Sequence, residues 1–433
     1  MYDLIIKNGV VVLPHEVKNV DIGIQDGKIV ALSSSLQVAS SSVYNAENCY
    51  VLPGVIDAHV HLNEPGRDHW EGFTTGSQML AAGGCTTYFD MPLNSIPATI
   101  NENAFHEKKK IGSEKSINDF RLWGGLVPGN LSELASLHNL GVIGFKAFLS
   151  PSGTEEFGHT DDETLLEGMR EIARLGSVLA LHAESTPIIE HLERNVNIED
   201  QVQAYSHMRP IIAESEAVKR SLSFAELTGC ALHFVHISNT STLQLIQEAK
   251  QQGLNVTVET CPHYLLFNDQ AMYEHGVHAK CAPPLRNEEH RAQLVQALIN
   301  GQIDFVASDH SPSPNTLKQT GNFFTAWGGI NGGQFTLLSL LELTETTSLT
   351  IQDVAQLTAT APASRFKLTR DRGSIEEGKL ADLVVVNKDN HDAVTKETLH
   401  SKHKDSLYLG HRFPHRIKET FYRGQSIYKS NRP

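Results

Sequence analysis

The chain has 433 residues, of which 40% are hydrophobic and 20% are charged, the composition of an ordinary soluble globular protein. Its length exceeds that of one average domain, so we expect one large α/β domain with a small second one. A formal net charge of -14 argues against nucleic acid or a membrane surface as a partner, since both reward clustered Lys and Arg. Five widely spaced cysteines without a Cys-x-x-Cys pair indicate reduced thiols rather than a disulfide framework or a zinc knuckle. The N-terminus lacks a signal-peptide profile and no apolar stretch is long enough to span a bilayer, so we expect a cytoplasmic protein.

Both ends of the chain have the short alternating runs of β-strands. Each end has too few strands to bury a sheet face alone, so we expect the two ends to pair into one small β-sandwich domain. That domain would comprise residues 1–53 and 366–433, with residues 54–365 inserted between its halves. The expected strands are 3–12, 20–24 and 28–32, followed by a Ser-rich linkage over 33–42, and then 379–387, 417–422 and 426–429.

The middle of the chain alternates eight short apolar or β-branched runs with amphipathic stretches of helical period. This alternation predicts a (β/α)8 TIM-like barrel, whose sites lie at the C-terminal ends of the strands. An open doubly wound sheet is the alternative, but no Gly-x-Gly-x-x-Gly turn follows a first strand. The runs are 56–61, 86–91, 122–127, 142–148, 178–184, 233–238, 256–261 and 304–310, and expected helices include 162–175, 215–227, 241–252 and 288–299.

The first run ends in His59-Val60-His61. Side chains alternate along a strand, so the two imidazoles aim at the same point, which is a metal-binding arrangement. Alone the motif is a weak signal, and a half-buried pair of histidines near a sheet edge has the same pattern.

Polar residues at the ends of other runs strengthen the metal interpretation. In a barrel these side chains converge on one mouth, and imidazole and carboxylate groups suit zinc or a similar divalent ion. Their number exceeds the three ligands common for one catalytic zinc, which favours two ions about 3.5–4 Å apart. The candidate ligands are His59, His61, Lys146, His182, His236 and Asp309.

Lys146 does not fit this set as an ammonium, which has no lone pair and would repel a dication. A buried lysine near positive charge loses its proton more readily, and the free amine can add carbon dioxide to give a carbamate. We therefore predict that Lys146 is carboxylated and bridges the two ions. A lysine that extends from a strand end toward solvent, or one that binds a substrate anion, is the alternative.

The same residues lie within motifs that resemble the metal-dependent cyclic amidohydrolases, the family of allantoinases, dihydroorotases and hydantoinases. The resemblance covers essentially the whole chain and implies that the six candidate ligands bind a binuclear centre. Within the family the motifs are most similar to those of the allantoinase group. They are residues 63–67 (NEPGR), 70–73 (WEGF), 90–95 (DMPLNS), 123–128 (WGGLVP), 146–148 (KAF), 151–153 (PSG), 280–284 (KCAPP) and 308–312 (SDHSP).

Dihydroorotases differ at the positions that would hold a substrate carboxylate. That group carries an arginine two residues after the second metal histidine and an asparagine before the Pro-Pro pair, where this chain has Asn63 and Ala282. It also carries a histidine where this chain has Ser313. The charged bidentate anchor is therefore absent, and Asn63 suits a neutral amide or ureido group better. Arg67 is the one alternative anchor nearby.

The resemblance implies hydrolytic ring opening of allantoin to allantoate, with a dihydroorotase or a hydantoinase as the alternatives. Two ions, zinc being the expected metal, would lower the pKa of a bridging water, and Asp309 would be both ligand and general acid/base. Relatives suggest a homotetramer. A non-enzymatic assembly protein is the contrasting class, but all six ligand positions are filled here. Candidate substrate contacts just past strand ends are Asn63, Asn94, Ser152, Ala282 and Ser311.

Two further features near the expected mouth have open interpretations. Residues 315–333, rich in glycine and aromatic side chains, would be either a lid or an ordered surface excursion. His263, directly beyond the seventh run, would be a residue that supports the metal ligands, a residue of a substrate loop, or a structural one.

Overall fold

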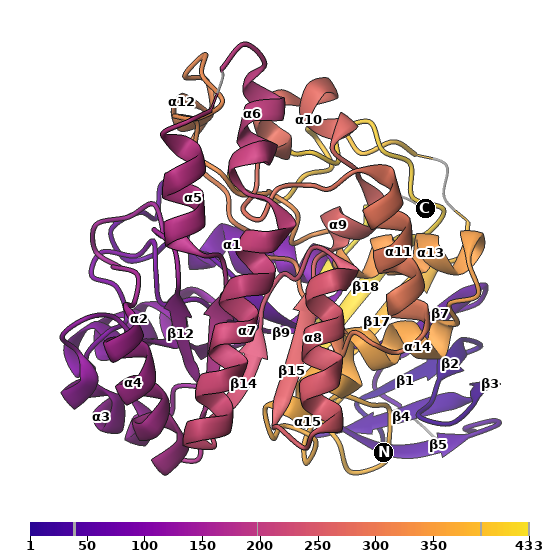
Figure 1. Ribbon diagram of the computed structural model, residues 1–433. Helices are drawn as coiled ribbons and strands as arrows, with labels where there is room; N and C mark the ends of the chain where they lie inside the picture. Colours follow the sequence, from indigo (N-terminus) through magenta and orange to yellow (C-terminus); the bar gives the residue numbers. More distant parts are fainter. Residues whose placement is uncertain (38–39, 197, 390–391, 432–433) are drawn as a thin grey trace.

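The computed structural model describes residues 1–37, 40–196, 198–389 and 392–431. Its centre is a barrel of parallel strands with helices packed outside, and a smaller β region lies at one side, where both chain ends contribute strands (Figure 1). The expected (β/α)8 barrel with a terminal β-sandwich is thereby confirmed. Val38 and Ala39, part of the Ser-rich linkage, lie outside the described residues.

The barrel strands correspond to the eight predicted runs. Neighbouring strands are parallel in two sheets, ordered β10-β9-β8 and β11-β12-β13-β14-β15-β16. The third strand begins at Asp119, earlier than the predicted run 122–127, and is interrupted at Trp123 between β10 and β11. A parallel bridge between Val60 and His310 joins the first run to the last. The bounds are β8 Val55–Val60, β9 Cys85–Asp90, β10 Asp119–Leu122, β11 Gly124–Gly125, β12 Phe145–Phe148, β13 Val178–His182, β14 Ala231–Phe234, β15 Val256–Thr260 and β16 Phe305–Val306.

Helices cover the outside of the barrel, and the four predicted amphipathic stretches are α4, α7, α8 and α11. Three begin at side-chain caps, and α7 ends at Gly229, whose φ of 71° suits a residue without a Cβ. The longer helices are α1 Phe73–Ala82, α2 Glu102–Lys115, α4 Asp162–Arg174, α5 Thr186–Glu193, α6 Gln201–Met208, α7 Ile211–Thr228, α8 Thr240–Gln251, α11 Glu288–Ile299 and α13 Thr336–Thr346. Shorter ones are α3 Leu134–Asn139, α9 Pro262–Leu266, α10 Gln270–Glu274, α12 Asn315–Lys318, α14 Ile351–Ala355, α15 Ala361–Arg365, the 3-10 turns Leu131–Glu133 and Gly276–Ala279, and the π-helix Gln356–Thr360.

The two chain ends share a sandwich of two sheets, ordered β5-β4-β1-β6 and β19-β18-β17-β7-β2-β3. Strand β17 from the C-terminal end pairs antiparallel with β7 from the N-terminal end, and side chains such as Ile22, Val51 and Val385 pack between the sheets. The domain boundaries themselves stay a prediction. The strands are β1 Leu4–Lys7, β2 Val10–Val12, β3 Val17–Asn19, β4 Asp21–Gln25, β5 Lys28–Ser33, β6 Val43–Asn45, β7 Cys49–Pro53, β17 Leu383–Asn387, β18 Arg416–Tyr422 and β19 Gln425–Lys429.

The single strand expected over residues 3–12 was wrong: it is two strands in different sheets. Asn8 has a φ of 63°, which ends β1, and a Cβ on Gly9 would lie 2.7 Å from Val51 Cγ2. The apolar run before His59 is also divided, at Gly54. A Cβ there would lie 2.3 Å from Thr86 Oγ1, so only glycine permits the close passage from the sandwich strand β7 to the barrel strand β8.

All five cysteines are buried and unpaired with one another. Among the described residues, none of the helices combines the length and apolar character needed to cross a bilayer.

Candidate metal centre

The six candidate ligands lie at the C-terminal ends of five barrel strands. His59 is in β8 with His61 directly after it, Lys146 is in β12 and His182 ends β13, while His236 and Asp309 follow β14 and β16 within a few residues. All but Lys146 line one cavity of about 520 Å³ at the barrel mouth. The structure therefore brings together the side chains that the strand count had placed at one mouth.

One half of the centre is formed by His59, His61 and Asp309. Asp309 Oδ1 lies 3.1 Å from His59 Nε2 and 3.3 Å from His61 Nε2, and the possible ligand atoms all lie within 4.8 Å of one another. Burial opposes ionisation of Asp309, but the facing His59 and His61 rings hold the pKa of its carboxyl well below the ordinary value. Two nitrogens and a carboxylate oxygen directed at one point can hold a divalent ion.

The other half is formed by His182 and His236. His182 Nδ1 lies 2.9 Å from His236 Nε2, and burial lowers the pKa of both rings, so both are neutral near pH 7. His182 Nε2 is occupied by Glu184 Oε2 at 2.8 Å. When Nε2 carries the proton, the Nδ1 lone pair faces His236 Nε2 and is available to a cation.

Lys146 is the sixth candidate ligand and lies beneath the cavity surface, outside its lining. Its side chain is fully buried, and within the described part of the chain its Nζ has no hydrogen-bond partner. Burial lowers the pKa of Lys146 to about 8, so roughly a tenth of its side chains are free amine at pH 7, far more than for an ordinary lysine. A buried, unpartnered amine beside four imidazoles fits carboxylation better than a structural ion pair, and the residues together fit a metal group.

The backbone adopts an uncommon conformation at both halves. His236 has a φ of 42° and Asp309 a φ of 46°, and Asn63 and Asn94 each have a φ of 66°. Non-glycine residues in this region are rare and cost of the order of 1–3 kcal/mol each, so the surrounding packing must impose them. These turns direct the side chains of His236 and Asp309 into the mouth instead of along their strands.

Two buried carboxylates support the histidines and were not assigned a role from the sequence. Glu259 Oε1 lies 2.6 Å from His59 Nδ1, and Glu184 bonds His182 as described. Burial would raise the pKa of each carboxyl, but neighbouring cations and histidines hold both at about 2. A signal was present: His182 and Glu184 alternate onto one face, and Glu259 is the one charged residue of β15.

The predicted substrate contacts differ in where they lie. Asn94, Ser152, Ala282 and Ser311 line the cavity. Asn63 is fully buried outside that lining, and its Nδ2 donates to Pro312 O at 3.5 Å. Their contact with a substrate stays a prediction.

The segment 315–333, for which a lid and an ordered surface excursion were the alternatives, forms part of the cavity wall over residues 324–329. Trp327 packs edge-on against Trp70, with ring centroids 4.7 Å apart, which joins the loop after β16 to the loop after β8. Two buried lysines hold the backbone of this segment. Lys280 Nζ donates to Phe324 O at 3.1 Å and Ala326 O at 2.6 Å, and Lys318 Nζ donates to Trp327 O at 3.2 Å and Gly329 O at 2.8 Å.

Two residues with open interpretations lie outside the cavity lining. Arg67 donates to Asn94 O at 2.8 Å and pairs with Glu156 at 3.1 Å, so its guanidinium is already occupied. His263 is buried, and among the described residues neither of its ring nitrogens has a hydrogen-bond partner.

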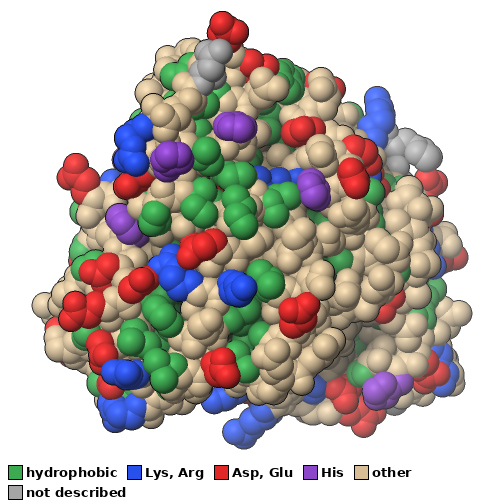
Figure 2. Space-filling view, viewed as in Figure 1, with side chains coloured by type: hydrophobic (Ala, Val, Ile, Leu, Met, Phe, Trp, Pro, Cys, Tyr) green, Lys and Arg blue, Asp and Glu red, His purple; other side chains and the backbone are tan. Residues whose placement is uncertain are grey.

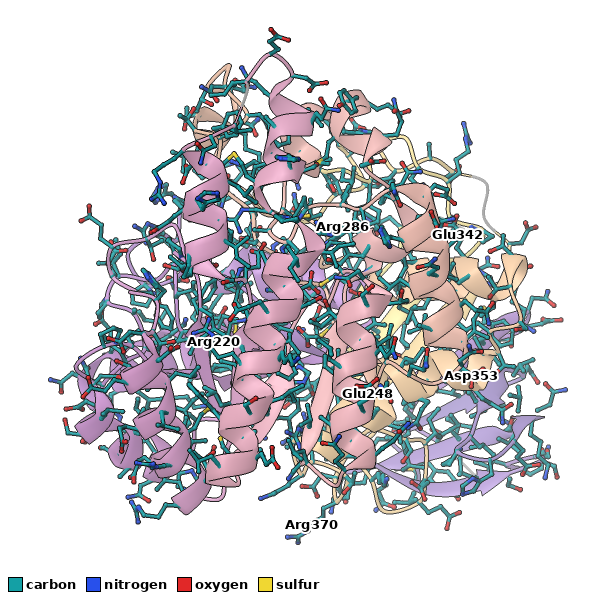
Figure 3. The ribbon with its side chains drawn as sticks, in the orientation of Figure 1. Arg220, Glu248, Arg286, Glu342, Asp353 and Arg370 are labelled. Atoms are coloured by element: carbon teal, nitrogen blue, oxygen red, sulfur yellow. The ribbon has the colours of Figure 1, made fainter. Side chains whose placement is uncertain are left out.

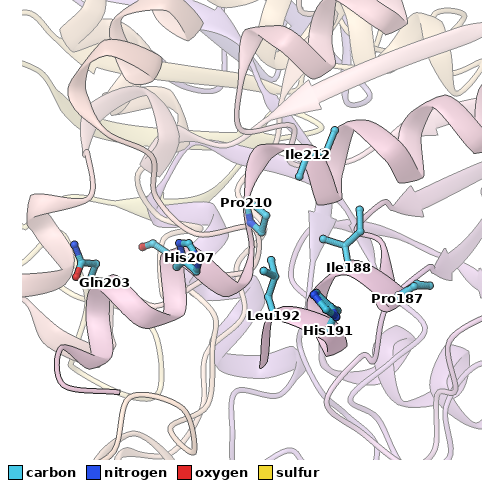
Figure 4. Close-up of a pocket in the computed structure, with 9 residues that line it drawn as sticks. Pro187, Ile188, His191, Leu192, Gln203, His207, Pro210 and Ile212 are labelled. Carbon is cyan, nitrogen blue, oxygen red and sulfur yellow. The ribbon is translucent and has the colours of Figure 1, made fainter. Parts of the chain in front are cut away.

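A second hollow, of about 830 Å³, is apolar and holds none of the six candidate ligands (Figure 4). It lies between α5, α6 and the start of α7, where Figure 2 shows hydrophobic side chains gathered beside histidines. Its lining includes Ile188, Leu192, Pro210 and Ile212. Its polar residues, His191, Gln203, Ser206 and His207, include no carboxylate and no lysine, unlike those of the barrel mouth.

Comparisons with known proteins identify the family of the chain. The model of the amidohydrolase family matches residues 50–407. The chain is 50% identical to an allantoinase of Bacillus velezensis and 46% identical to one of Solibacter usitatus, covering 99% of this chain and 94% of each relative. Among solved structures, an L-hydantoinase (dihydropyrimidinase) from Arthrobacter aurescens superposes with a TM-score of 0.96 at 32% identity, covering 99% of this chain and 96% of that one. The chain belongs to the amidohydrolase family.

Proposed function

We propose that the protein hydrolyses the cyclic amide bond of allantoin, opening the hydantoin ring to give allantoate. The observation that carries the proposal is the similarity to allantoinases over 99% of the chain, at up to 50% identity. Hydrolysis of a cyclic amide needs an activated water, a polarised carbonyl and a proton for the leaving nitrogen. The barrel mouth offers groups for each of these tasks.

The proposed cofactors are two divalent ions, with zinc as the expected metal because the ligands are imidazoles and carboxylates. His59, His61 and Asp309 would hold one ion, and His182 and His236 the other. Lys146 would join them after its amine nitrogen adds to the carbon of carbon dioxide and releases a proton, which gives a carbamate. Bound at this place, the ions would lower the pKa of a water molecule and act as Lewis acids toward the amide carbonyl.

Asp309 is the proposed general acid/base. Its carboxyl is ionised at neutral pH because the neighbouring histidines hold its pKa well below the ordinary value. It lies at the cavity wall, where it can accept a proton from the attacking water and donate it to the leaving ring nitrogen.

The charges around the cavity favour a neutral substrate over one with a carboxylate. Arg209 lines the cavity but is paired with Glu184, and Lys280 is held by two backbone carbonyls. Arg67 is occupied by Glu156. A carboxylate would therefore have to displace an existing partner, whereas the ureido and ring amides of allantoin are neutral.

Comparative kinetics would test the proposal. One enzyme preparation would be assayed with allantoin, dihydroorotate and a monosubstituted hydantoin. Its metal content and the mass added by carboxylation of Lys146 would be measured as well. We expect the highest kcat/KM for allantoin. A higher value for the hydantoin would instead favour a hydantoinase, the alternative supported by the superposition with the L-hydantoinase.

Assembly into a homotetramer is part of the proposal and rests on the family resemblance alone. Light scattering coupled to size-exclusion chromatography would measure the mass directly, against a subunit of 47.7 kDa. The cytoplasmic location stays a prediction.

A further inference from the structure

Each half of the candidate centre contains one histidine whose outward ring nitrogen meets a buried carboxylate. On one side His59 Nδ1 lies 2.6 Å from Glu259 Oε1. On the other, His182 Nε2 lies 2.8 Å from Glu184 Oε2. The two histidines therefore face the mouth with different atoms: His59 presents Nε2 to Asp309, and His182 presents Nδ1 to His236.

A neutral imidazole has one N–H and one lone pair, so the nitrogen that donates to a carboxylate decides which nitrogen can bind a cation. A carboxylate accepts and cannot donate. Glu259 thus requires the proton of His59 on Nδ1, and Glu184 requires the proton of His182 on Nε2. Without Glu259 the proton of His59 could instead lie on Nε2, facing Asp309 Oδ1 at 3.1 Å, and without Glu184 the proton of His182 could lie on Nδ1.

Separate groups hold the two carboxylates in place. Glu259 Oε2 lies 3.1 Å from His233 Nε2, whose Nδ1 lies 3.0 Å from Thr257 Oγ1, so this support comes from β14 and β15. Three of these residues are fully buried, and Thr257 is half-buried. His59, His233 and Glu259 are each at most 1% exposed.

Glu184 is held by other segments: the end of α6 and the loops that follow β14 and precede α11. Arg209, at the end of α6, pairs with Glu184 Oε2. The Arg209 carbonyl accepts from Arg286 Nη1 at 2.6 Å, and Arg286 also donates to Ser238 Oγ at 3.0 Å. Arg286 lies near the upper end of the barrel beside α7 (Figure 3). No hydrogen bond between described residues joins this chain to the Glu259 chain.

We propose that Glu184 and Glu259 are positioning residues, each of which fixes the tautomer and orientation of one histidine and so supports one half of a two-part metal centre independently of the other. This inference rests on the proposed metal centre. It further implies that the affinity of one ion can be lowered separately from that of the other. A centre that depended only on the residues contacting the metal would not need such separate supports. Removing such an outer partner commonly weakens metal binding about 10- to 100-fold.

Zinc titration of chelator-stripped protein would test this, with bicarbonate present and the heat and stoichiometry measured. Glu184→Gln and Glu259→Gln keep the side-chain volume, but they replace a carboxylate, which only accepts hydrogen bonds, by an amide that can also donate. We expect each variant to weaken one of the two ions about 10- to 100-fold and to affect the other, to which it is linked only through Lys146, much less. The two variants test the inference separately, so it can be contradicted even where one of them does not fold.

Combining each glutamine variant with His182→Ala shows which of the two ions that variant weakens. In that background Glu184→Gln should have no further effect, whereas Glu259→Gln should still weaken the remaining ion. Glu342→Gln is the matched control, because Glu342 Oε2 lies 2.6 Å from His411 Nε2 outside the cavity lining. Figure 3 places Glu342 on α13, toward the edge of the molecule.

The outcomes separate the inference from the function on which it rests. Wild-type protein that binds fewer than two ions contradicts the metal centre itself. Wild-type protein that binds two ions, with both variants weakening both ions equally or weakening neither, overturns the positioning roles alone.

Discussion

The backbone N–H of His61 donates to the carbonyl of His310 at 2.8 Å, across 249 positions of sequence. This bond lies where the first barrel strand meets the last, next to the bridge between Val60 and His310. Because Asp309 directly precedes His310, the same contact brings Asp309 Oδ1 to within 3.3 Å of His61 Nε2. The contact that closes the barrel therefore also brings together one half of the candidate centre.

Replacing Lys146 by alanine should remove metal and activity together. The cavity left behind would admit a short carboxylate, so acetate or propionate at high concentration should restore part of the activity. Metal analysis by mass spectrometry and turnover of allantoin would be measured with and without the acid. Wild-type protein should not gain activity from the same acids. Full activity of the unrescued variant would contradict a bridging role.

Asp309→Asn should lower kcat by about 10²- to 10⁴-fold, the usual contribution of a positioned acid/base. The amide keeps an oxygen that can still face the His59 and His61 nitrogens, so some metal should remain bound. Steady-state kinetics would be paired with metal content for each preparation. A near-normal kcat with metal present would rule out Asp309 as the proton carrier.

Lys108→Met should destabilise the fold by about 3–5 kcal/mol, because it leaves a buried charge without a partner. Lys108 Nζ lies 2.6 Å from Asp90 Oδ2 and both side chains are fully buried. The other oxygen of Asp90, Oδ1, accepts a hydrogen bond at 2.7 Å from the backbone N–H of Leu62, the residue that follows His61. Urea unfolding would measure the change, and the double variant with Asp90→Asn should recover part of it. Equal stability of single and double variants would contradict the argument.

Lys318→Met should flatten the pH dependence of stability above neutral pH. Burial, together with the smaller effect of the nearby Lys280, lowers the pKa of Lys318 from 10.5 to about 7. Between these values the unfolded chain binds a proton that the folded chain does not, so wild-type stability rises with pH, by up to about 1.4 kcal/mol per unit. Urea unfolding from pH 7 to about 9.5 would measure the slope. Lys219→Met, at an exposed position, should leave the slope unchanged.

The positions of the candidate ligands could be predicted because they follow from local periodicity and from counting strands. His59 and His61 share a face through the period of two, and His182, His236 and Asp309 end later strands of the same barrel. The helices were predictable for the same reason: α4, α7, α8 and α11 have an apolar face and a terminal stop in the sequence itself.

What the sequence could not predict depends on contacts between distant segments. The split of residues 3–12 into β1 and β2 follows from the packing of Gly9 against Val51. The left-handed turns at His236 and Asp309 are imposed by their surroundings and have no glycine to announce them. Glu259 meets His59 across 200 positions, so its partner is visible only once the barrel is closed.

Lys280 and Lys318 grip the loop of residues 324–329 by its carbonyl oxygens, which every amino acid carries. These backbone contacts hold the wall whatever side chains it carries, in addition to the packing of Trp327 against Trp70. Side chains of the wall other than Trp327 can therefore be exchanged to suit a different ring substituent with these contacts intact. Lys280 and Lys318 thus allow the substrate-facing side chains to change without a change in the backbone position of the cavity wall.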